Sequence, residues 1–406
     1  MPVLSDLLGK SFVFTRAYTP NPESSPARAS LFTGLDPCVH GLWTNGVTLP
    51  AIEQTFVRTL AQAGYANYLA GRYQLSGVSQ WTTEAIRPGE FIQADWAHGP
   101  LHRSRQNAYL VWLQNEAPDR YSVIFETQAN PGDTKATQQQ VAALQALPDA
   151  LSFNHWVGER TAGWIKDQPA NQPFLAIAGL SVGQHYGAES PEGSDSETVD
   201  KTALSQADAA IEQIRDQIDQ SQLTDDTVLI IVAARGNANA GENNYSLHED
   251  EIRVPVVIHS PGQAGQVFDS IVSTIDLAPT ILKLANVFSP RRLQGTSILN
   301  ADSADIIHRA WNLSRLRRNR VDGQNDWQTA LCVDDMKLVV SHDTGGKPGN
   351  SNNENISLYK LDTDPLEQNN LANDEAYAPE LEHLIDQMID ARCALEDRTE
   401  PRVAEF

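Results

Sequence analysis

One short segment combines a hydroxyl group with an arginine, two residue types that take part in chemistry on anionic esters. It reads Ser24-Ser-Pro-Ala-Arg28 and continues to Gly34. A serine hydroxyl is a weak nucleophile unless a base or a metal ion lowers its pKa. The planar guanidinium group of arginine matches the oxygens of a tetrahedral oxyanion such as sulfate. A reaction at Ser24 therefore needs partners from elsewhere in the chain.

Apolar runs indicate the elements that would position such partners. Four continuous runs predict strands buried on both faces of a parallel sheet, at residues 121–125, 174–178, 228–232 and 254–258. A helix face between two of them is indicated by the spacing of Ala209, Ile211, Ile214 and Ile218. Strands that alternate with helices predict the α/β class, as a three-layer α/β/α sandwich with a mostly parallel central sheet. Ligands of such a sheet bind at the carboxyl ends of its strands.

The last part of the chain predicts a small C-terminal α+β subdomain. Two strand-like pieces at residues 336–341 and 356–361 flank a loop-like segment at 345–355 that is rich in glycine and asparagine. An amphipathic helix at 376–395 follows, with apolar residues at helical spacing: Leu381, Leu384, Ile385, Met388 and Ile389. We expect this helix to pack on its own sheet rather than on a partner. The core domain is then placed at 1–325 and the subdomain at 326–406.

Further short motifs follow the segment around Ser24 in a fixed order. The earlier ones are Asp36-Pro-Cys-Val-His40-Gly, Ala70-Gly-Arg72-Tyr-Gln74-Leu and Gln184-His185-Tyr. The later ones are Ile252-Arg-Val-Pro, Asp276-Leu-Ala-Pro-Thr-Ile-Leu, Leu293-Gln-Gly-Thr-Ser and Leu358-Tyr-Lys-Leu-Asp. From residue 1 to about 390 this order resembles the sulfatases of the alkaline phosphatase superfamily, including arylsulfatases and phosphonate monoester hydrolases.

The resemblance implies how such a site works. In the family, the residue at the position of Ser24 becomes a formylglycine whose hydrated form attacks sulfur, and a divalent ion acts as Lewis acid and template. Arg28 and His185 match family residues, whereas Arg72 and Gln74 stand where the family has lysine and histidine. Glutamine cannot exchange a proton as a general acid does. We therefore interpret Ser24, Arg28 and His185 as a vestigial catalytic site, with Arg72 and Gln74 beside them.

The metal ligands implied by the resemblance are missing from this sequence. The family carries two aspartates at the end of a first strand, upstream of the segment that corresponds to residues 1–5. A second ligand pair follows the strand at 228–232, where this chain has Ala234 and Arg235. Alanine cannot coordinate a cation and arginine repels one, so we expect no metal and no other cofactor. Ca²⁺ or Mg²⁺ is expected only if the chain is an active hydrolase.

The first strand is central in the family, and its absence predicts unpaired edges on both neighbouring strands. Two outcomes are open. Another segment fills the gap, or the neighbouring strands close up.

Three functional hypotheses remain open. In the first, the protein is a pseudoenzyme that has lost metal-dependent hydrolysis of sulfuric esters and serves in binding or assembly. A narrower form predicts that Arg28, Arg72, Arg235 and His185 converge on a sulfate- or phosphate-type anion. In the second, the chain is an active sulfatase or phosphonate monoester hydrolase with an unusual or incomplete metal site. In the third, it is one subunit of a homo- or hetero-oligomer with a sulfatase homologue.

Composition excludes several classes of partner. Acidic residues outnumber basic ones 52 to 30, and the formal net charge is −22. Such a surface repels nucleic acid and anionic membranes. The chain starts without the pattern of a secretory signal, and three scattered cysteines (Cys38, Cys332, Cys393) suit a reducing compartment, which predicts the cytoplasm. The acidic run at 248–251 is expected to be solvated.

Overall fold

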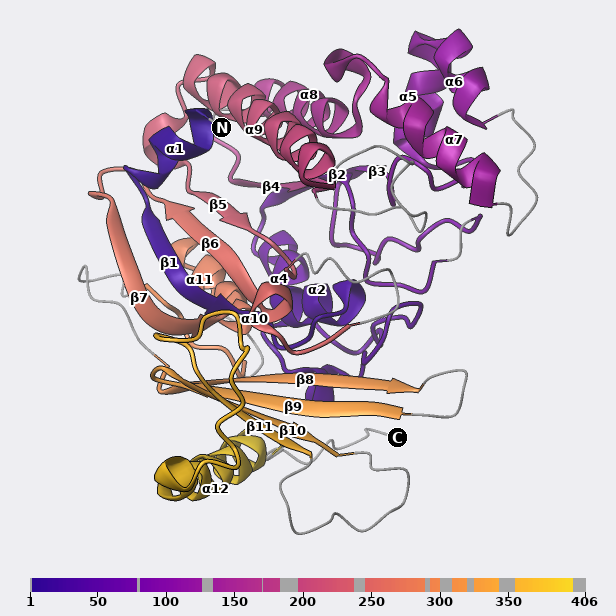
Figure 1. Cartoon of the computed structure of the whole chain (residues 1–406). Coiled ribbons are helices and arrows are strands. Elements are labelled where there is room, and N and C mark those ends of the chain that lie inside the picture. The colour runs from indigo at the N-terminus through magenta and orange to yellow at the C-terminus, as the bar shows by residue number, and fades with distance from the viewer. Residues whose placement is uncertain are drawn as a thin grey trace, which may run out of the picture.

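The computed structural model of this 406-residue chain describes residues 2–78, 81–125, 134–169, 171–182, 196–236, 245–288, 293–299, 309–319, 325–342 and 355–396. Two sheets form the core and a third lies below them (Figure 1). The first core sheet has the order β5 (Leu229–Val232), β6 (Arg253–His259), β1 (Phe12–Tyr18) and β7 (Gln266–Ser273). The second has the order β3 (Gln93–Trp96), β2 (Ala66–Gly71) and β4 (Phe174–Gly179).

Strand directions follow the prediction in part. The second core sheet is entirely parallel, and β1 is parallel to β7. The predicted runs at 174–178, 228–232 and 254–258 are confirmed as β4, β5 and β6. The last of them, however, runs antiparallel to both β1 and β5.

The strand predicted at residues 121–125 is wrong. These residues belong to the helix α6 (Pro118–Phe125), which has Pro118 in its first turn followed by Asp119. Proline is tolerated there because the first backbone N–H groups of a helix lack intrahelical acceptors. A five-residue run with four apolar side chains does not separate a strand from a buried helix turn.

Helices cover both faces of the core sheets, as the layered prediction requires. On one face lie α1 (Pro2–Leu8), α8 (Phe153–Lys166) and α9 (Ser196–Gln220). The last includes the predicted helix face, with Ile211, Ile214 and Ile218 buried. On the other face lie α2 (Ser24–Thr33), α4 (Phe56–Gln62) and α11 (Leu277–Leu284). The α/β class and the three-layer architecture are therefore confirmed.

Further helices of the core domain lie between these elements in the sequence. They are α3 (Pro37–His40), α5 (Ala108–Glu116), α7 (Thr134–Gln145) and α10 (Glu249–Ile252). Single 3₁₀ turns lie at Asp149–Leu151, Thr224–Asp226, Thr274–Asp276 and Glu375–Tyr377.

The two core sheets each end in a partly exposed apolar edge strand. In the described part of the chain, β4 pairs only with β2 and β5 only with β6. Leu175 and Ile177 of β4 and Ile230 of β5 nevertheless pack against one hydrophobic cluster, and all three stay half-buried. The edges anticipated from the sequence are therefore present. Within the described residues no segment fills the gap, and the strands have not closed up.

The C-terminal sheet is antiparallel and small. Its order is β11 (Ile356–Lys360), β10 (Met336–Ser341), β9 (Asn325–Val333) and β8 (Trp311–Asn319). The predicted strands at 336–341 and 356–361 are thus confirmed, whereas most of the predicted loop at 345–355 lies outside the described residues. The boundary at residue 325 stays a prediction, although the sheet already includes β8.

The helix α12 (Ala378–Glu396) covers the far face of this sheet (Figure 1). Leu381, Leu384 and Met388 pack against apolar side chains of the strands, which confirms that the helix docks on its own sheet. Ile389 is 54 % exposed and lies outside this face.

The acidic run at 248–251 is solvated only at His248 and Asp250, so the expectation is wrong for the other two residues. It forms α10, in which Glu249 and Glu251 are buried. Glu249 and Glu367 both form ion pairs with the fully buried Lys337 of β10, at 3.1 and 2.8 Å. This buried network joins the core to the C-terminal sheet. Its partners come from segments far apart in sequence, which is why local composition did not indicate it.

Among the described residues, no helix is long and apolar enough to cross a lipid bilayer.

Candidate functional site

Ser24 occupies the first position of α2. The preceding Glu23 is extended and buried, and its carboxylate accepts hydrogen bonds from Thr44 Oγ1 (2.9 Å) and the Asn45 backbone (2.8 Å). The Ser25 backbone N–H donates to Asn45 Oδ1 at 2.9 Å. These contacts hold the start of the helix, so the Ser24 hydroxyl has a defined position.

Arg235 reaches this hydroxyl from the end of β5. Its Nε donates a hydrogen bond to Ser24 Oγ at 3.0 Å, and its guanidinium carbon lies 5.5 Å from the ring centre of Tyr245. The Tyr245 hydroxyl in turn accepts a hydrogen bond from Asn45 Nδ2 at 3.1 Å. Arg235 is therefore held against the serine by the ring of Tyr245, and Tyr245 is bonded to the same Asn45 that holds the start of α2.

Arg28 lies one turn further along α2, close enough to Arg72 and Arg235 for their charges to act on it. The charges of Arg72, Glu84 and Arg235 all act on it. Burial, followed by the positive charges of Arg72 and Arg235, lowers the pKa of Arg28 to about 9, and Glu84 opposes this shift. Its Nε atom is fully buried and has no hydrogen-bond partner among the described residues. Arg28, Arg72 and Arg235 thus form what we call the three-arginine cluster.

Arg72 enters the cluster from the end of β2. It is buried, and its Nε donates a hydrogen bond to the His98 carbonyl at 2.8 Å. β2 ends at Gly71, which has a φ of +85°, a left-handed conformation that glycine adopts without strain. The neighbouring Gly179 at the end of β4 packs so closely on the Arg72 backbone that a Cβ has no room. The carboxyl ends of two parallel strands are therefore packed tightly beneath Arg72.

Gln74 occupies a strained position in the loop after β2. Its φ is +62°, and its backbone N–H donates to Glu84 Oε2 at 2.9 Å. Glu84 also accepts hydrogen bonds from the Leu75 backbone (2.6 Å) and from Trp96 Nε1 (2.8 Å). Burial raises the pKa of Glu84 above its ordinary value, and these hydrogen bonds oppose the rise. The Gln74 loop is therefore shaped by a buried carboxyl group.

Two charged or titratable neighbours of the cluster were missed from the sequence. One is Glu84. The other is His98, whose pKa falls to about 3 because of its burial and the positive charges of Arg72, His102 and Arg28. His98 follows β3, a strand too short and too polar to be recognised as an apolar run. Had β3 been recognised, the rule that ligands bind at strand ends would have indicated this histidine.

Some predicted positions fall outside the described residues. His185 is among them, so its role stays a prediction. The structure does bring together Ser24, Arg28, Arg72 and Arg235, which are up to 211 positions apart in sequence.

The described residues around Ser24 do not provide a ligand set for a divalent cation. No group of three or more His, Cys, Asp or Glu residues in the described part of the chain is arranged to hold a metal ion. Ala234 offers no ligand atom, and Arg235 presents a positive charge to the serine. Hard cations need several oxygen ligands, chiefly carboxylates. The expectation that the site holds no metal nevertheless stays a prediction.

The family model for sulfatases matches residues 1–287 of this chain. The chain belongs to the sulfatase family. It is 24% identical to the uncharacterized sulfatase YidJ of Escherichia coli, with 95% of this chain and 81% of that protein covered. It is 25% identical to human N-acetylgalactosamine-6-sulfatase, with 73% of this chain and 60% of that enzyme covered.

A solved structure shows the same fold. The phosphonate monoester hydrolase of Agrobacterium radiobacter superposes with a TM-score of 0.74 at 17% identity, covering 97% of this chain and 91% of that one. The resemblance inferred from the motifs is therefore confirmed at the level of family and fold.

Proposed function

We propose that this sulfatase-family protein binds a sulfate- or phosphate-type anion at the three-arginine cluster without hydrolysing sulfuric esters, as a pseudoenzyme. The observation that supports this most directly is the hydrogen bond from Arg235 Nε to Ser24 Oγ at 3.0 Å. A guanidinium group has no acceptor atom and cannot take a proton from the hydroxyl. The Arg235 guanidinium therefore favours the binding of an anion near Ser24 and does not act as a base that activates the serine hydroxyl.

The expected loss of turnover follows from how such sites work. A single preorganised electrostatic group in an active site is typically worth ~10²–10³ in rate. The rate effects of catalytic groups that act together are not additive, but little turnover is left once all of these groups are absent. With arginine and alanine at the ligand positions after β5, the cluster keeps the charge that attracts an anion.

Replacement of Arg235 by alanine is expected to weaken sulfate binding by about 10- to 100-fold, because a charge-assisted hydrogen bond contributes roughly 1.5–3 kcal/mol. Titration calorimetry of the full chain with sodium sulfate measures the change. Arg215→Ala is the matched control, since Arg215 pairs with Asp6 on the surface. Equal affinities in wild type and Arg235→Ala would contradict the proposal, as would wild-type protein that neither releases heat nor gains thermal stability with millimolar sulfate.

Sulfate affinity is also expected to depend on pH through Arg28. Sulfate binds the charged form of Arg28, whose pKa in the free protein is about 9. Affinity should therefore stay constant below that pH and fall as the pH rises through it. Sulfate is the suitable probe because its own charge does not change in this range. An affinity that is flat from about pH 7 to about pH 10 would exclude Arg28 as the titrating group.

The alternative is an active sulfatase or phosphonate monoester hydrolase. The half-buried edge strands β4 and β5 favour it, because each has one edge unpaired in the described part of the chain. Metal analysis of the purified protein together with turnover of 4-nitrophenyl sulfate separates the two proposals. A stoichiometric divalent ion with turnover that a chelator abolishes would overturn the pseudoenzyme.

Two further expectations accompany the proposal. A cytoplasmic location is supported by Cys38, Cys332 and Cys393, none of which forms a disulfide bond in the described part of the chain. Assembly with a sulfatase homologue stays open, and copurification with an active homologue would favour it.

A further inference from the structure

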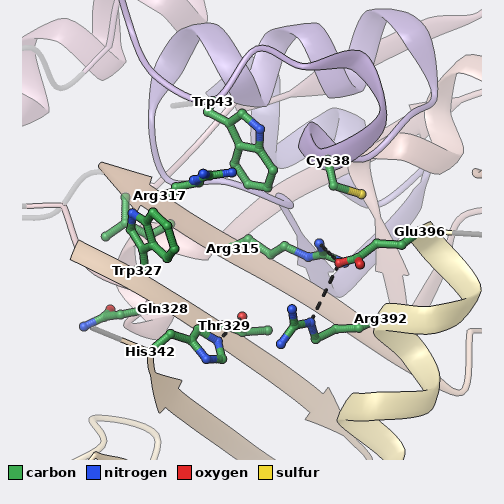
Figure 2. Close-up of a pocket in the computed structure, with 11 residues that line it drawn as sticks. Cys38, Trp43, Arg315, Arg317, Trp327, Gln328, Thr329, His342, Arg392 and Glu396 are labelled. Carbon is green, nitrogen blue, oxygen red and sulfur yellow. Dashed lines mark hydrogen bonds and ion pairs between the residues drawn. The ribbon is translucent and has the colours of Figure 1, made fainter. Parts of the chain in front are cut away.

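A cavity of ≈ 640 Å³ lies between the core and the C-terminal sheet and shares no lining residue with the three-arginine cluster (Figure 2). Three arginines line it: Arg315 and Arg317 of β8, and Arg392 of α12. Glu396 is the carboxylate on its wall, among the described residues. In a chain with a net charge of −22 this local excess of positive charge is unusual. The volume is in the range of small-molecule sites.

Arg315 is the buried member of this group. It is 6% exposed, and its Nη1 donates to Glu396 Oε1 at 2.7 Å. Its Nε and Nη2 atoms are fully buried and have no hydrogen-bond partner within the described residues, although Nε lies 3.9 Å from Asp36 Oδ1. A buried donor without an acceptor costs about 1–3 kcal/mol. Because neither atom is exposed to the cavity, Arg315 acts on a ligand there through its positive charge.

Arg317 and Arg392 complete a positive wall. Arg317 lies between two indole rings, 5.5 Å from the ring centre of Trp43 and 4.4 Å from that of Trp327 (Figure 2). These cation–π contacts fix the guanidinium group at the cavity. Arg392 Nε lies 3.8 Å from Glu396 Oε1, so two arginines share one half-exposed carboxylate. The positive charge is therefore only partly neutralised.

Neutral polar groups line the side of the cavity opposite Trp43. His342 Nε2 and Thr329 Oγ1 are 2.8 Å apart. Burial and the positive charges of Arg392 and Arg315 lower the pKa of His342. His342 is therefore neutral at neutral pH and, together with Thr329 and Gln328, offers hydrogen bonds to an uncharged part of a ligand.

We propose that this cavity binds a small organic ester of phosphate or sulfate, of about the size of a monosaccharide ester. Its oxyanion takes N–H groups of the half-exposed Arg392, since the guanidinium fork matches a tetrahedral oxyanion, and the buried charge of Arg315 adds to the attraction. The body of the ligand lies along Thr329 and His342. This site is independent of the anion proposed for Ser24.

Titration calorimetry of the full chain with glucose 6-phosphate and glucose 6-sulfate tests the proposal, and the pair shows which oxyanion is preferred. Arg392→Ala is expected to weaken binding of the preferred ester at least 10-fold, the loss of one charged hydrogen bond. Arg315→Met is expected to weaken it by a smaller factor, because only a buried positive charge at the wall of the cavity is lost. Arg235→Ala is expected to leave it unchanged, which separates this site from the three-arginine cluster.

Three results would overturn the inference. They are wild-type affinity in Arg392→Ala, wild-type affinity in Arg315→Met at an unchanged melting temperature, and binding of uncharged glucose as tightly as either ester. Arg392 has a half-exposed side chain, so its variant keeps the test valid even if Arg315→Met fails to fold.

Discussion

Replacement of Lys337 by methionine is expected to lower the free energy of unfolding by about 3–5 kcal/mol, because it leaves two buried carboxylates without their cation. Lys337 Nζ is fully buried and lies 3.1 Å from Glu249 Oε1 and 2.8 Å from Glu367 Oε1. Burial lowers the pKa of Lys337, but Cys332, Glu249 and Glu367 outweigh it and raise the pKa above its ordinary value. The folded protein therefore holds this lysine charged. Urea unfolding at neutral pH measures the loss.

The pH dependence of that loss identifies its cause. Burial raises the pKa of Glu367, but the hydrogen bond to His248 and the charge of Lys337 outweigh burial and lower it. A lowered carboxyl pKa contributes stability above the ordinary value of 4.5, and this stability is lost as the pH falls through the native pKa. The gap between wild type and Lys337→Met should therefore shrink in acid. A gap independent of pH would point to lost packing instead of unpaired charge.

Lys360→Met is the matched control for this experiment. Lys360 lies on the neighbouring strand β11 and pairs with Asp362 at 3.6 Å, with both side chains about 40% exposed. An exposed pair of this kind is worth ~0–1 kcal/mol. A control as unstable as Lys337→Met would mean that the sheet tolerates no methionine in these strands.

Replacement of Arg28 by methionine is expected to have two opposite effects. Sulfate affinity should fall by about 10–100-fold, because the central member of the three-arginine cluster is gone. Stability in anion-free buffer should rise by about 0.5–2 kcal/mol, since sites built for binding are often strained. The charged Arg28 is disfavoured in the folded protein by burial and by Arg72 and Arg235, as its lowered pKa shows. Thermal unfolding with and without sulfate measures both effects.

Arg58→Met provides the control for Arg28→Met. Arg58 is half-buried like Arg28 but lies on α4. It should change neither the sulfate response nor the anion-free stability by a comparable amount. If Arg28→Met instead destabilises the protein while Arg58→Met does not, Arg28 stabilises the position of helix α2. That result would contradict the proposal that Arg28 is there to bind an anion.

Local patterns were sufficient for much of the fold. β4, β5 and β6 each contain a continuous apolar run, and α12 carries its buried residues at helical spacing, so neighbouring positions in the sequence indicate which residues are buried. The motif order identified the sulfatase family because each motif depends on only a few adjacent residues. The same reasoning failed for α6, whose short apolar run suits a strand and a helix equally.

The sequence predicted the arginines of the candidate site but not the residues that surround them. The sequence indicated Arg28, Arg72 and Arg235, and their electrostatic coupling in the structure shows that they lie near one another. It did not indicate Glu84 or His98. Both are distant from Arg28 in sequence, and only the packing of β2 and β3 brings them near it.

The sequence by itself determined the family, the α/β class and the chemical types at the site, since these depend on local order along the chain. Only the tertiary structure decided that Arg235 contacts Ser24, that Lys337 is buried between two glutamates and that Arg315 is buried at the wall of a cavity. The physical reason is that burial and pairing of charges depend on distant segments. A charged side chain looks the same in a sequence whether water or another charge surrounds it.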